Sequence, residues 1–210
     1  IFVMDADGAN PQNLTSSASE SDSTFDPAWS PDGTLIAFRS HRAPIGLYIM
    51  DADGSGATEL VSGEGAWAPA WSPDGTLIAY EDGNEIWMVD VDTKATTKLT
   101  TNPNAAYAPE WSPDDTLIAF FRADGGVDAV YTVNINTLVE TNISQTPSTS
   151  ASYPDWSPDG SKIVFASGTA GLSDIWTMDA GGLNQALIPA PANSDKYDSR
   201  PDWSPVLTPS

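Results

Sequence analysis

Short runs of apolar residues recur along the chain, separated by polar turns that are rich in Pro, Asp and Gly. Runs of four or five residues with many β-branched and aromatic side chains are typical of strands, and no segment keeps the apolar period of a helix. The pattern therefore predicts an all-β protein. The clearest of the predicted strands are Leu35–Phe38, Leu77–Tyr80, Leu117–Phe121 and Ile163–Phe165.

One phrase that contains these runs is repeated. "PAWSPDGTLIAF" at 27–38 returns with small changes at 69–80, 109–120 and 154–165, and a shortened copy begins at 201. The Trp residues of successive copies are 42, 40, 45 and 47 residues apart, which suits the four-stranded blade of a β-propeller. Each Trp ends a short first strand, and we expect it to pack between neighbouring blades. These residues are Trp29, Trp71, Trp111, Trp156 and Trp203.

Two further strand-like pieces complete each repeat, for example "LYIMD" at 47–51 and "TTKLT" at 96–100. The chain opens with "IFVMDADG", which matches the third piece of a blade, and closes with a first piece, "RPDWS". We therefore expect a five-bladed propeller in which the two ends of the chain share one composite blade. The predicted blades of this single domain, 1–210, are 24–62, 66–100, 106–144 and 151–188, with 1–15 plus 198–208 as the composite blade.

The turn inside the phrase has a simple chemical explanation. In Ser30-Pro31-Asp32-Gly33, proline presets the backbone of the second position, and glycine accepts the left-handed conformation at the end. The phrase is thus predicted to be a tight hairpin between the first and second strands of a blade. Asp115 replaces the glycine in the third copy, and a short polar side chain tolerates that conformation.

Charge and composition exclude several classes of partner. The net charge is −21, with 8 Lys and Arg residues against 29 Asp and Glu residues. Such a surface repels phosphate backbones, so nucleic acid is excluded as a partner. No apolar run reaches the length of a membrane span, so we expect no direct insertion into a membrane. The chain has no Cys and therefore no thiolate nucleophile or disulfide.

The repeated phrase, followed by "IxxMDxDG" and "LT", resembles the WD40-like β-propeller repeat of the TolB family. This resemblance covers essentially the whole chain. It implies a propeller that is commonly exported in bacteria and often serves as a binding platform. We accordingly expect a periplasmic or extracellular, cell-surface location.

The resemblance also implies that two sets of loops share the face around the channel mouth. These loops run from the fourth strand to the next first strand, and from the second strand to the third. Aromatic and guanidinium groups gathered there suit a peptide, a carboxylate or a sugar. The alternative is that the aromatic side chains pack under the loops and the arginines pair with Asp26, Glu81, Asp124 or Asp198. The predicted ligand-binding residues are Phe25, Trp67, Tyr107, Tyr153, Tyr197, Arg39, Arg42, Arg122 and Arg200.

Catalytic chemistry has little support in the sequence. The only histidine, His41, is interpreted as an ordinary loop residue, and the chain lacks both a G-x-S-x-G elbow and a His cluster for a metal. Paired carboxylates for glycoside hydrolysis stay open among so many acidic residues. We expect no cofactor, with Ca²⁺ in turns such as Asp51–Gly54 as the less favoured alternative.

The sequence thus predicts a non-enzymatic binding module with a protein or peptide partner. The first alternative is a structural module of a larger extracellular protein or assembly, including self-association through the incomplete blade. The second alternative is a carbohydrate-active or peptide-processing enzyme domain.

Overall fold

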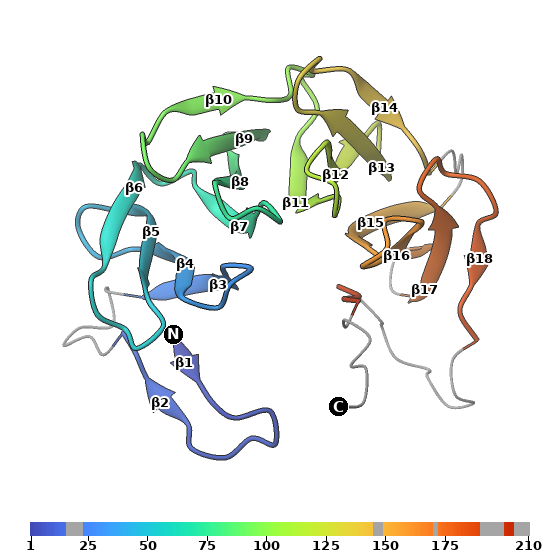
Figure 1. Ribbon diagram of the computed structural model, residues 1–210. Coiled ribbons are helices and arrows are strands. Elements are labelled where there is room, and N and C mark those ends of the chain that lie inside the picture. Colours follow the sequence, from blue (N-terminus) through green and yellow to red (C-terminus); the bar gives the residue numbers. More distant parts are fainter. Residues whose placement is uncertain (16–22, 145–148, 170–171, 190–199, 204–210) are drawn as a thin grey trace. The chain divides into compact units, whose positions relative to one another are not determined.

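The computed structural model describes residues 1–15, 23–144, 149–169, 172–189 and 200–203. This part of the chain is all-β, as predicted, and no helix in it is long and apolar enough to cross a membrane (Figure 1). The strands are β1 (Phe2–Val3), β2 (Gln12–Asn13), β3 (Thr24–Trp29), β4 (Leu35–Ser40), β5 (Gly46–Asp51), β6 (Thr58–Ser62), β7 (Trp67–Trp71), β8 (Leu77–Asp82), β9 (Glu85–Asp90), β10 (Thr96–Lys98), β11 (Ala106–Trp111), β12 (Leu117–Asp124), β13 (Val127–Asn134), β14 (Glu140–Asn142), β15 (Ser150–Trp156), β16 (Lys162–Thr169), β17 (Leu172–Asp179) and β18 (Ala186–Leu187).

The strands form four four-stranded sheets in sequence order, β3–β6, β7–β10, β11–β14 and β15–β18, and a two-stranded sheet of β1 and β2. Neighbouring strands are antiparallel, as in β12 and β13, which pair without a shift from Leu117↔Asn134 to Asp124↔Val127. The second and third strands extend beyond their predicted ends, whereas outer strands such as β18 are shorter than expected. The five-blade count and the composite blade stay predictions.

The described chain divides into two compact units. The first comprises residues 1–83 and 87–97, and the second comprises 84–86 and 98–210. The boundary runs through the sheet β7–β10, and each unit is described separately below. The single-domain organisation stays a prediction.

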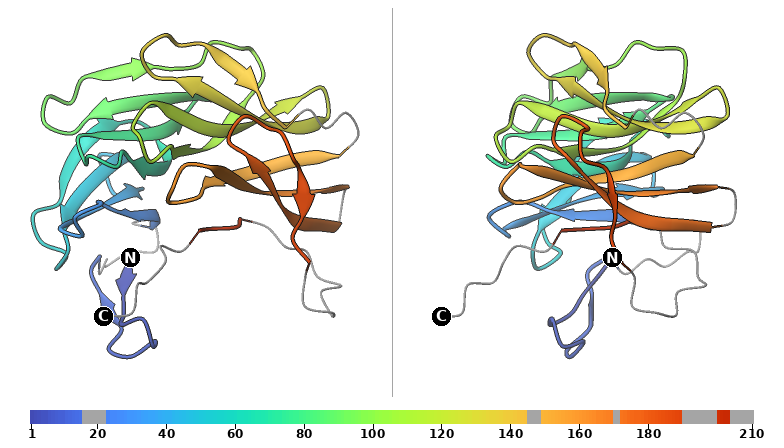
Figure 2. Two further views of the ribbon diagram at one scale, coloured as in Figure 1. Left: turned by 45° about the vertical axis from the view of Figure 1, so that its right-hand side comes forward. Right: turned by 90° about the vertical axis from the view of Figure 1, so that its right-hand side faces the viewer.

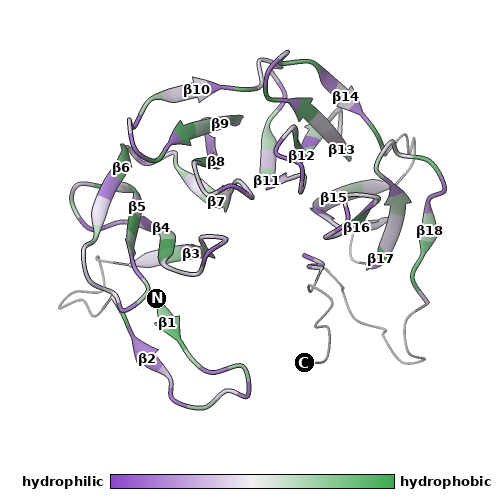
Figure 3. Cartoon of the chain, viewed as in Figure 1, coloured by the Kyte–Doolittle hydropathy of each residue, from purple (hydrophilic) through white to green (hydrophobic). Residues whose placement is uncertain are grey.

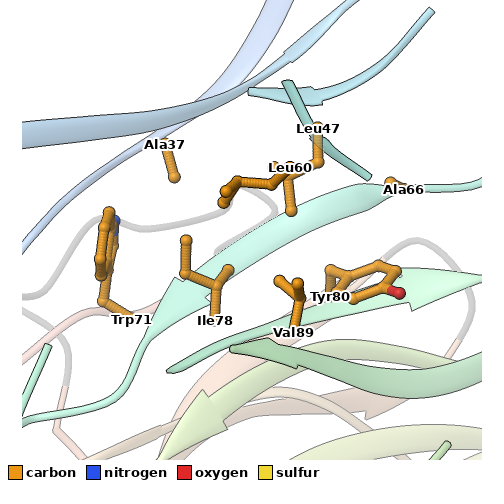
Figure 4. Packing of buried hydrophobic residues seen from close by; sticks show 8 residues of the cluster. All are labelled: Ala37, Leu47, Leu60, Ala66, Trp71, Ile78, Tyr80 and Val89. Carbon is orange, nitrogen blue, oxygen red and sulfur yellow. The ribbon is translucent and has the colours of Figure 1, made fainter. Parts of the chain in front are cut away.

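In the first unit, two sheets stack through one apolar cluster (Figure 4). Ala37, Leu47 and Leu60 of the sheet β3–β6 face Ile78 and Val89 of the next sheet. The two layers can be followed in the turned views of Figure 2. Burial of this apolar surface is the main contribution that holds the two sheets together.

The second unit repeats this arrangement with other residues. Ala119 and Val130 of the sheet β11–β14 pack with Ile163, Phe165 and Met178 of the sheet β15–β18. The buried second strands carry apolar residues on both faces, which explains the continuous "LIAF" and "IVF" runs in the sequence.

Successive sheets within a unit also touch through a tryptophan and a glycine. Trp71 donates from Nε1 to the carbonyl oxygen of Ala28 in the preceding sheet, at 3.1 Å. A Cβ atom on Gly54 would lie 3.0 Å from the carbonyl oxygen of Leu14, which follows β2. In the second unit, a Cβ on Gly182 would overlap the carbonyl oxygen of Ile143. Glycine at the last position of the turns 51–54 and 179–182 therefore permits close approach to the preceding sheet.

The repeated hairpin turn forms as expected. Gly33 has φ 71° and donates its N–H to the carbonyl of Ser30 at 2.9 Å. Asp115 takes the same conformation in the third copy, with φ 59°. The Asp32 carboxylate accepts hydrogen bonds from the Ser30 hydroxyl (2.7 Å) and the Thr34 N–H (3.0 Å). These bonds lower the pKa of Asp32, and the turn is held by its own side chains.

Candidate functional site

The first strand of each repeat contains a bulge at its proline. Pairing with the second strand shifts register between Phe25 and Ala28 in β3, and at the equivalent positions of β7, β11 and β15. The residue before proline is left-handed in all four strands and again before Pro201, although residues before proline prefer extended backbone. A repeated bulge of this kind re-aims side chains at the start of the strand. The residues and φ angles are Asp26 (50°), Ala68 (47°), Ala108 (49°), Tyr153 (52°) and Arg200 (59°).

In the first unit, four side chains that carry a ring or a guanidinium group come together beside these bulges. The rings of Phe25 and Trp67 lie 6.3 Å apart between centroids, and His41 contacts both, at 5.1 Å and 5.8 Å. The Arg39 guanidinium lies over the Trp67 ring, 3.6 Å from its centroid. We call Phe25, Arg39, His41 and Trp67 the Trp67 cluster.

Within the Trp67 cluster, the Arg39 side chain is buried and holds its neighbours in place, so it is not an exposed ligand-binding group. Its Nε donates to Nε2 of His41 at 3.1 Å, and its Nη1 donates to the carbonyl oxygen of Ala66 at 3.3 Å. Burial lowers the pKa of Arg39, while the nearby carboxylates of Asp26 and Glu64 act in the opposite direction. The exposed atoms of the cluster come instead from Phe25 and Trp67, which are 40% and 38% exposed. The cluster thus presents two partly exposed rings, Trp67 packed on the guanidinium of Arg39 and Phe25 packed on His41 and Trp67.

A related group lies in the second unit. Phe121 contacts the rings of Tyr107 (5.3 Å) and Tyr153 (4.9 Å), and the Arg200 guanidinium lies 5.0 Å from the Tyr153 ring. Phe121 is the counterpart of Arg39, since each lies ten residues after the Trp of its repeat. An aromatic ring therefore replaces the buried guanidinium here. Tyr153 occupies the left-handed bulge position and not that of Phe25.

Arg122 does not belong with the predicted surface residues. It is 1% exposed, and its Nη1 pairs with Oε2 of Glu140 at 2.5 Å. Its guanidinium lies 4.8 Å from the Tyr131 ring and 5.1 Å from the Phe120 ring. Strand residues alternate between faces, and Arg122 lies one residue beyond the counterpart of Arg39, so it points to the opposite face. The structure thus places Arg122 as a buried ion-pair partner of Glu140, apart from the exposed rings, and its role in ligand binding stays a prediction.

The remaining predicted residues separate as follows. Arg42 is exposed, and its N–H donates to the Ser40 hydroxyl at 3.0 Å, so its role as a ligand-binding residue stays a prediction. Tyr197 lies outside the described residues.

His41 corrects the sequence interpretation, because it is a member of the cluster and accepts the hydrogen bond from Arg39. Reasoning from sequence missed that Arg39 and His41 are two residues apart, which places both on the same face of an extended chain.

The turns considered for calcium are explained by local hydrogen bonds. Oδ1 of Asp53 accepts from the Ser55 N–H at 2.9 Å, and Oδ1 of Asp90 accepts from the Thr93 N–H at 2.7 Å. Within the described ranges, no group of three or more His, Cys, Asp or Glu residues has an arrangement that could hold a metal ion. The expectation that the chain has no cofactor stays a prediction.

Three carboxyl groups in the second unit lie one residue before the Trp of their repeats: Glu110, Asp155 and Asp202. Burial, followed by the charges of Asp155 and Asp202, raises the pKa of Glu110 to about 8. Burial also raises the pKa of Asp155 to about 6, although the Trp203 N–H donates to its Oδ2 at 2.6 Å. Glu110 and Asp155 therefore hold protons at a pH where ordinary carboxyl groups have lost them.

Glu110→Gln is expected to stabilise the chain at pH 8 by roughly 1–3 kcal/mol and to change little at pH 4. The unfolded carboxyl group releases its proton near pH 4.5, whereas the folded one retains it up to about pH 8. Wild-type stability contributed by this group is therefore lost as the pH rises between these values. Urea unfolding at both pH values measures the effect, with the exposed Asp92→Asn as control. Equal stabilisation at pH 4 would contradict the explanation.

The four-stranded antiparallel sheets follow one another in sequence, and the first strand of each ends in the Trp of its repeat. This architecture is that of a β-propeller. Residues 39–207 match the family described as the TolB beta propeller domain. Because the match covers most of the chain, the protein belongs to this family. This confirms the resemblance that the repeated phrase indicates.

Individual relatives match over shorter stretches. The Tol-Pal system protein TolB of Xanthomonas campestris pv. campestris (strain B100) is 43% identical over 63 residues, which is 30% of this chain and 13% of that protein. The same figures hold for the protein of strain 8004. The matched stretch is thus a small part of the length of these relatives.

Solved structures show the same fold. TolB from Acinetobacter baumannii has a TM-score of 0.74 at 23% identity, covering 93% of this chain and 50% of that chain. A putative TolB from Agrobacterium tumefaciens has a TM-score of 0.77 at 23% identity, covering 89% and 72%. A puromycin-hydrolyzing peptidase of Mycobacterium tuberculosis has a TM-score of 0.73 at 16% identity, covering 96% and 37%. At these identities, the likeness shows the fold alone.

Proposed function

We propose that the chain is a non-enzymatic protein-binding module in which the Trp67 cluster recognises a peptide segment of a partner. The observation that carries this proposal is the pair of partly exposed rings, Phe25 and Trp67, which pack on each other while a buried guanidinium lies over Trp67. Aromatic side chains that are already ordered lose little entropy on binding, and Trp is enriched among residues that dominate binding energy. An apolar side chain of the partner would pack against these two rings.

The relatives support a protein partner but do not identify it. The curated ones are named as Tol-Pal system proteins, and the shared stretch is 13% of their length. We therefore propose protein binding in general and not a particular role in that system. The resemblance to TolB also favours a periplasmic location over the extracellular one.

The proposal excludes catalysis by His41. Its Nε2 already accepts the Arg39 N–H, which leaves that nitrogen without a free lone pair to serve as a general base. Similar folds occur in peptidases, but this chain covers only 37% of the mycobacterial enzyme. No observation within the described residues favours an enzyme as a second candidate.

Trp67→Ala is expected to weaken peptide binding at least about tenfold. The probe is a set of peptides selected from a random displayed library on the wild-type chain, with affinities measured by fluorescence anisotropy. Leu183→Ala is the matched control, since Leu183 is 68% exposed and lies in the other unit. Far-UV circular dichroism checks that both variants are folded. If no peptides are enriched, or if they bind Trp67→Ala as tightly as wild type, the proposed site is wrong.

A further inference from the structure

A surface cavity with a volume of about 350 Å³ lies between the first two four-stranded sheets of the first unit. The turns that follow β3 and β7 form two of its sides, and Figure 3 shows where the hydrophilic turn after β3 meets the hydrophobic strand β4. Phe25 and Trp67 lie near the beginning of the same two strands, so the cavity is at the opposite end from the Trp67 cluster. Its volume is at the small end of the range for ligand sites in proteins, which suits one long side chain of a partner.

The walls of this cavity are mainly apolar. They are formed by Pro31, Leu35, Trp71 and Pro73. The Trp71 ring is held by its place at one end of the buried cluster (Figure 4) and by the hydrogen bond from its Nε1 to the carbonyl oxygen of Ala28. Proline rings are rigid as well, so the walls are ordered before a ligand arrives. Such walls suit the methylene groups of a long side chain whose end is charged.

Two carboxylates, Asp32 and Asp74, also line the cavity. Oδ1 of Asp32 accepts from the Ser30 hydroxyl at 2.7 Å, and Oδ1 of Asp74 accepts from the Thr76 N–H at 2.9 Å. These bonds are the main causes that lower the pKa of the two carboxyl groups, so both are charged well below neutral pH. Among the described residues, Oδ2 of Asp32 is contacted by the Thr34 hydroxyl, which it shares with Oδ1. The turns thus fix two negative charges and leave acceptor capacity for a cation.

The internal repeat reproduces these residues in the second unit. A Cβ atom on Gly75 would lie 3.8 Å from Cδ of Pro31, and a Cβ on Gly160 would lie 3.7 Å from Cδ of Pro113. The turn of the later sheet therefore packs on the turn of the earlier one in the same way in both units. The counterparts of the four wall residues and the two carboxylates are of the same residue types: Pro113, Leu117, Trp156, Pro158, Asp114 and Asp159.

We propose that the cavity between the turns after β3 and β7 binds an arginine side chain of a partner protein. The methylene groups of the arginine pack on the apolar walls, and its planar guanidinium donates to the carboxylates of Asp32 and Asp74. Lysine fits this site less well, because its ammonium group is more strongly hydrated and does not stack on an aromatic ring as a guanidinium does. The net charge of −21 favours a cationic partner, because opposite charge speeds encounter.

The test titrates the full, isotope-labelled chain with the blocked peptide acetyl-Gly-Arg-Gly-amide and follows the indole N–H of Trp71 and the amides of 72–75 by two-dimensional NMR. Salt at about 0.15 M screens the general attraction of the acidic surface for cations. We expect saturable shifts at these groups. The matched peptide carries citrulline, which has nearly the shape of arginine and no charge, and it is expected to bind at least about tenfold more weakly. A lysine peptide is expected to bind more weakly than the arginine peptide.

The double variant Asp32→Asn with Asp74→Asn is expected to weaken binding of the arginine peptide at least about tenfold. Asparagine keeps an Oδ1 acceptor for the bonds of the turn, so the variant removes charge and retains the turn. Asp159→Asn is the matched control, since it removes the same group from a turn of the second unit and is expected to leave the shifts of Trp71 unchanged. Thermal unfolding checks that both variants are folded.

Trp67→Ala separates this proposal from the peptide site described above, because it is expected to leave the shifts of Trp71 unchanged. The proposal is overturned if these groups do not respond to the arginine peptide, or if the citrulline or lysine peptide binds as tightly. The comparison of peptides on the wild type decides this even where a variant does not fold. Undiminished binding by a folded double variant would also overturn it, and a dimer that the arginine peptide dissociates would replace the partner protein with a second copy of this chain.

Discussion

Replacing Trp71 with alanine is expected to lower the free energy of unfolding by about 3–5 kcal/mol. The ring is 9% exposed and belongs to the cluster that joins the first two four-stranded sheets (Figure 4). The substitution removes this apolar surface, leaves a cavity, and takes the donor from the carbonyl oxygen of Ala28. Urea unfolding followed by far-UV circular dichroism measures the loss.

Trp29→Ala is the matched control, because it removes the same side chain from the equivalent position of the preceding repeat. Trp29 is 49% exposed, so the expected loss is below about 1 kcal/mol. If both substitutions lower the free energy of unfolding by a similar amount, the difference in burial between Trp29 and Trp71 does not determine the loss. A negligible cost for Trp71→Ala would show that the two sheets do not depend on this contact.

Glu140→Ala is expected to destabilise the chain by about 2–4 kcal/mol, because it leaves the buried Arg122 guanidinium without its counter-ion. Arg122 is 1% exposed and Glu140 18%, and the ion pair measures 2.5 Å. The substitution also removes the acceptor for the Thr101 N–H. Nη2 of Arg122 already lacks a hydrogen-bond partner among the described residues, so little remains to compensate the charge.

The double variant Arg122→Met with Glu140→Leu tests whether the cost comes from the unpaired charge. Removing both charges and retaining apolar volume is expected to recover most of the stability. Thermal unfolding of the wild type, the Glu140→Ala variant and the double variant gives the comparison. A double variant that is no more stable than Glu140→Ala would place the cost in packing and not in electrostatics.

Turns and buried strands were predictable because their chemistry is local. The Ser30-Pro31-Asp32-Gly33 phrase carries its own hydrogen-bond partners, and the structure forms them in each complete copy. Even Asp115 could be placed in the left-handed region from its position in the phrase. Such features depend on neighbours within a few residues, which a sequence displays directly.

The site was less predictable because it depends on which way side chains point. Arg39 and Arg122 follow similar "AF" phrases, but Arg122 lies one residue later and therefore reaches the opposite face. The left-handed residue before the proline of each first strand contradicts the local preference, so only the complete sheet specifies it. The contact of His41 with Trp67 joins residues from different repeats and required the packing of two sheets.

Three contacts between successive sheets place a Trp or Gly of the later sheet against the backbone of the earlier one. Trp71 donates to the carbonyl oxygen of Ala28, and Gly54 and Gly182 lie close to the carbonyl oxygens of Leu14 and Ile143. In each pair, the later residue packs on backbone that the earlier part of the chain provides. Synthesis on the ribosome proceeds in the same direction, and early segments fold first. Each newly emerged sheet can thus dock on a finished template, so that the order of translation is also an order of assembly.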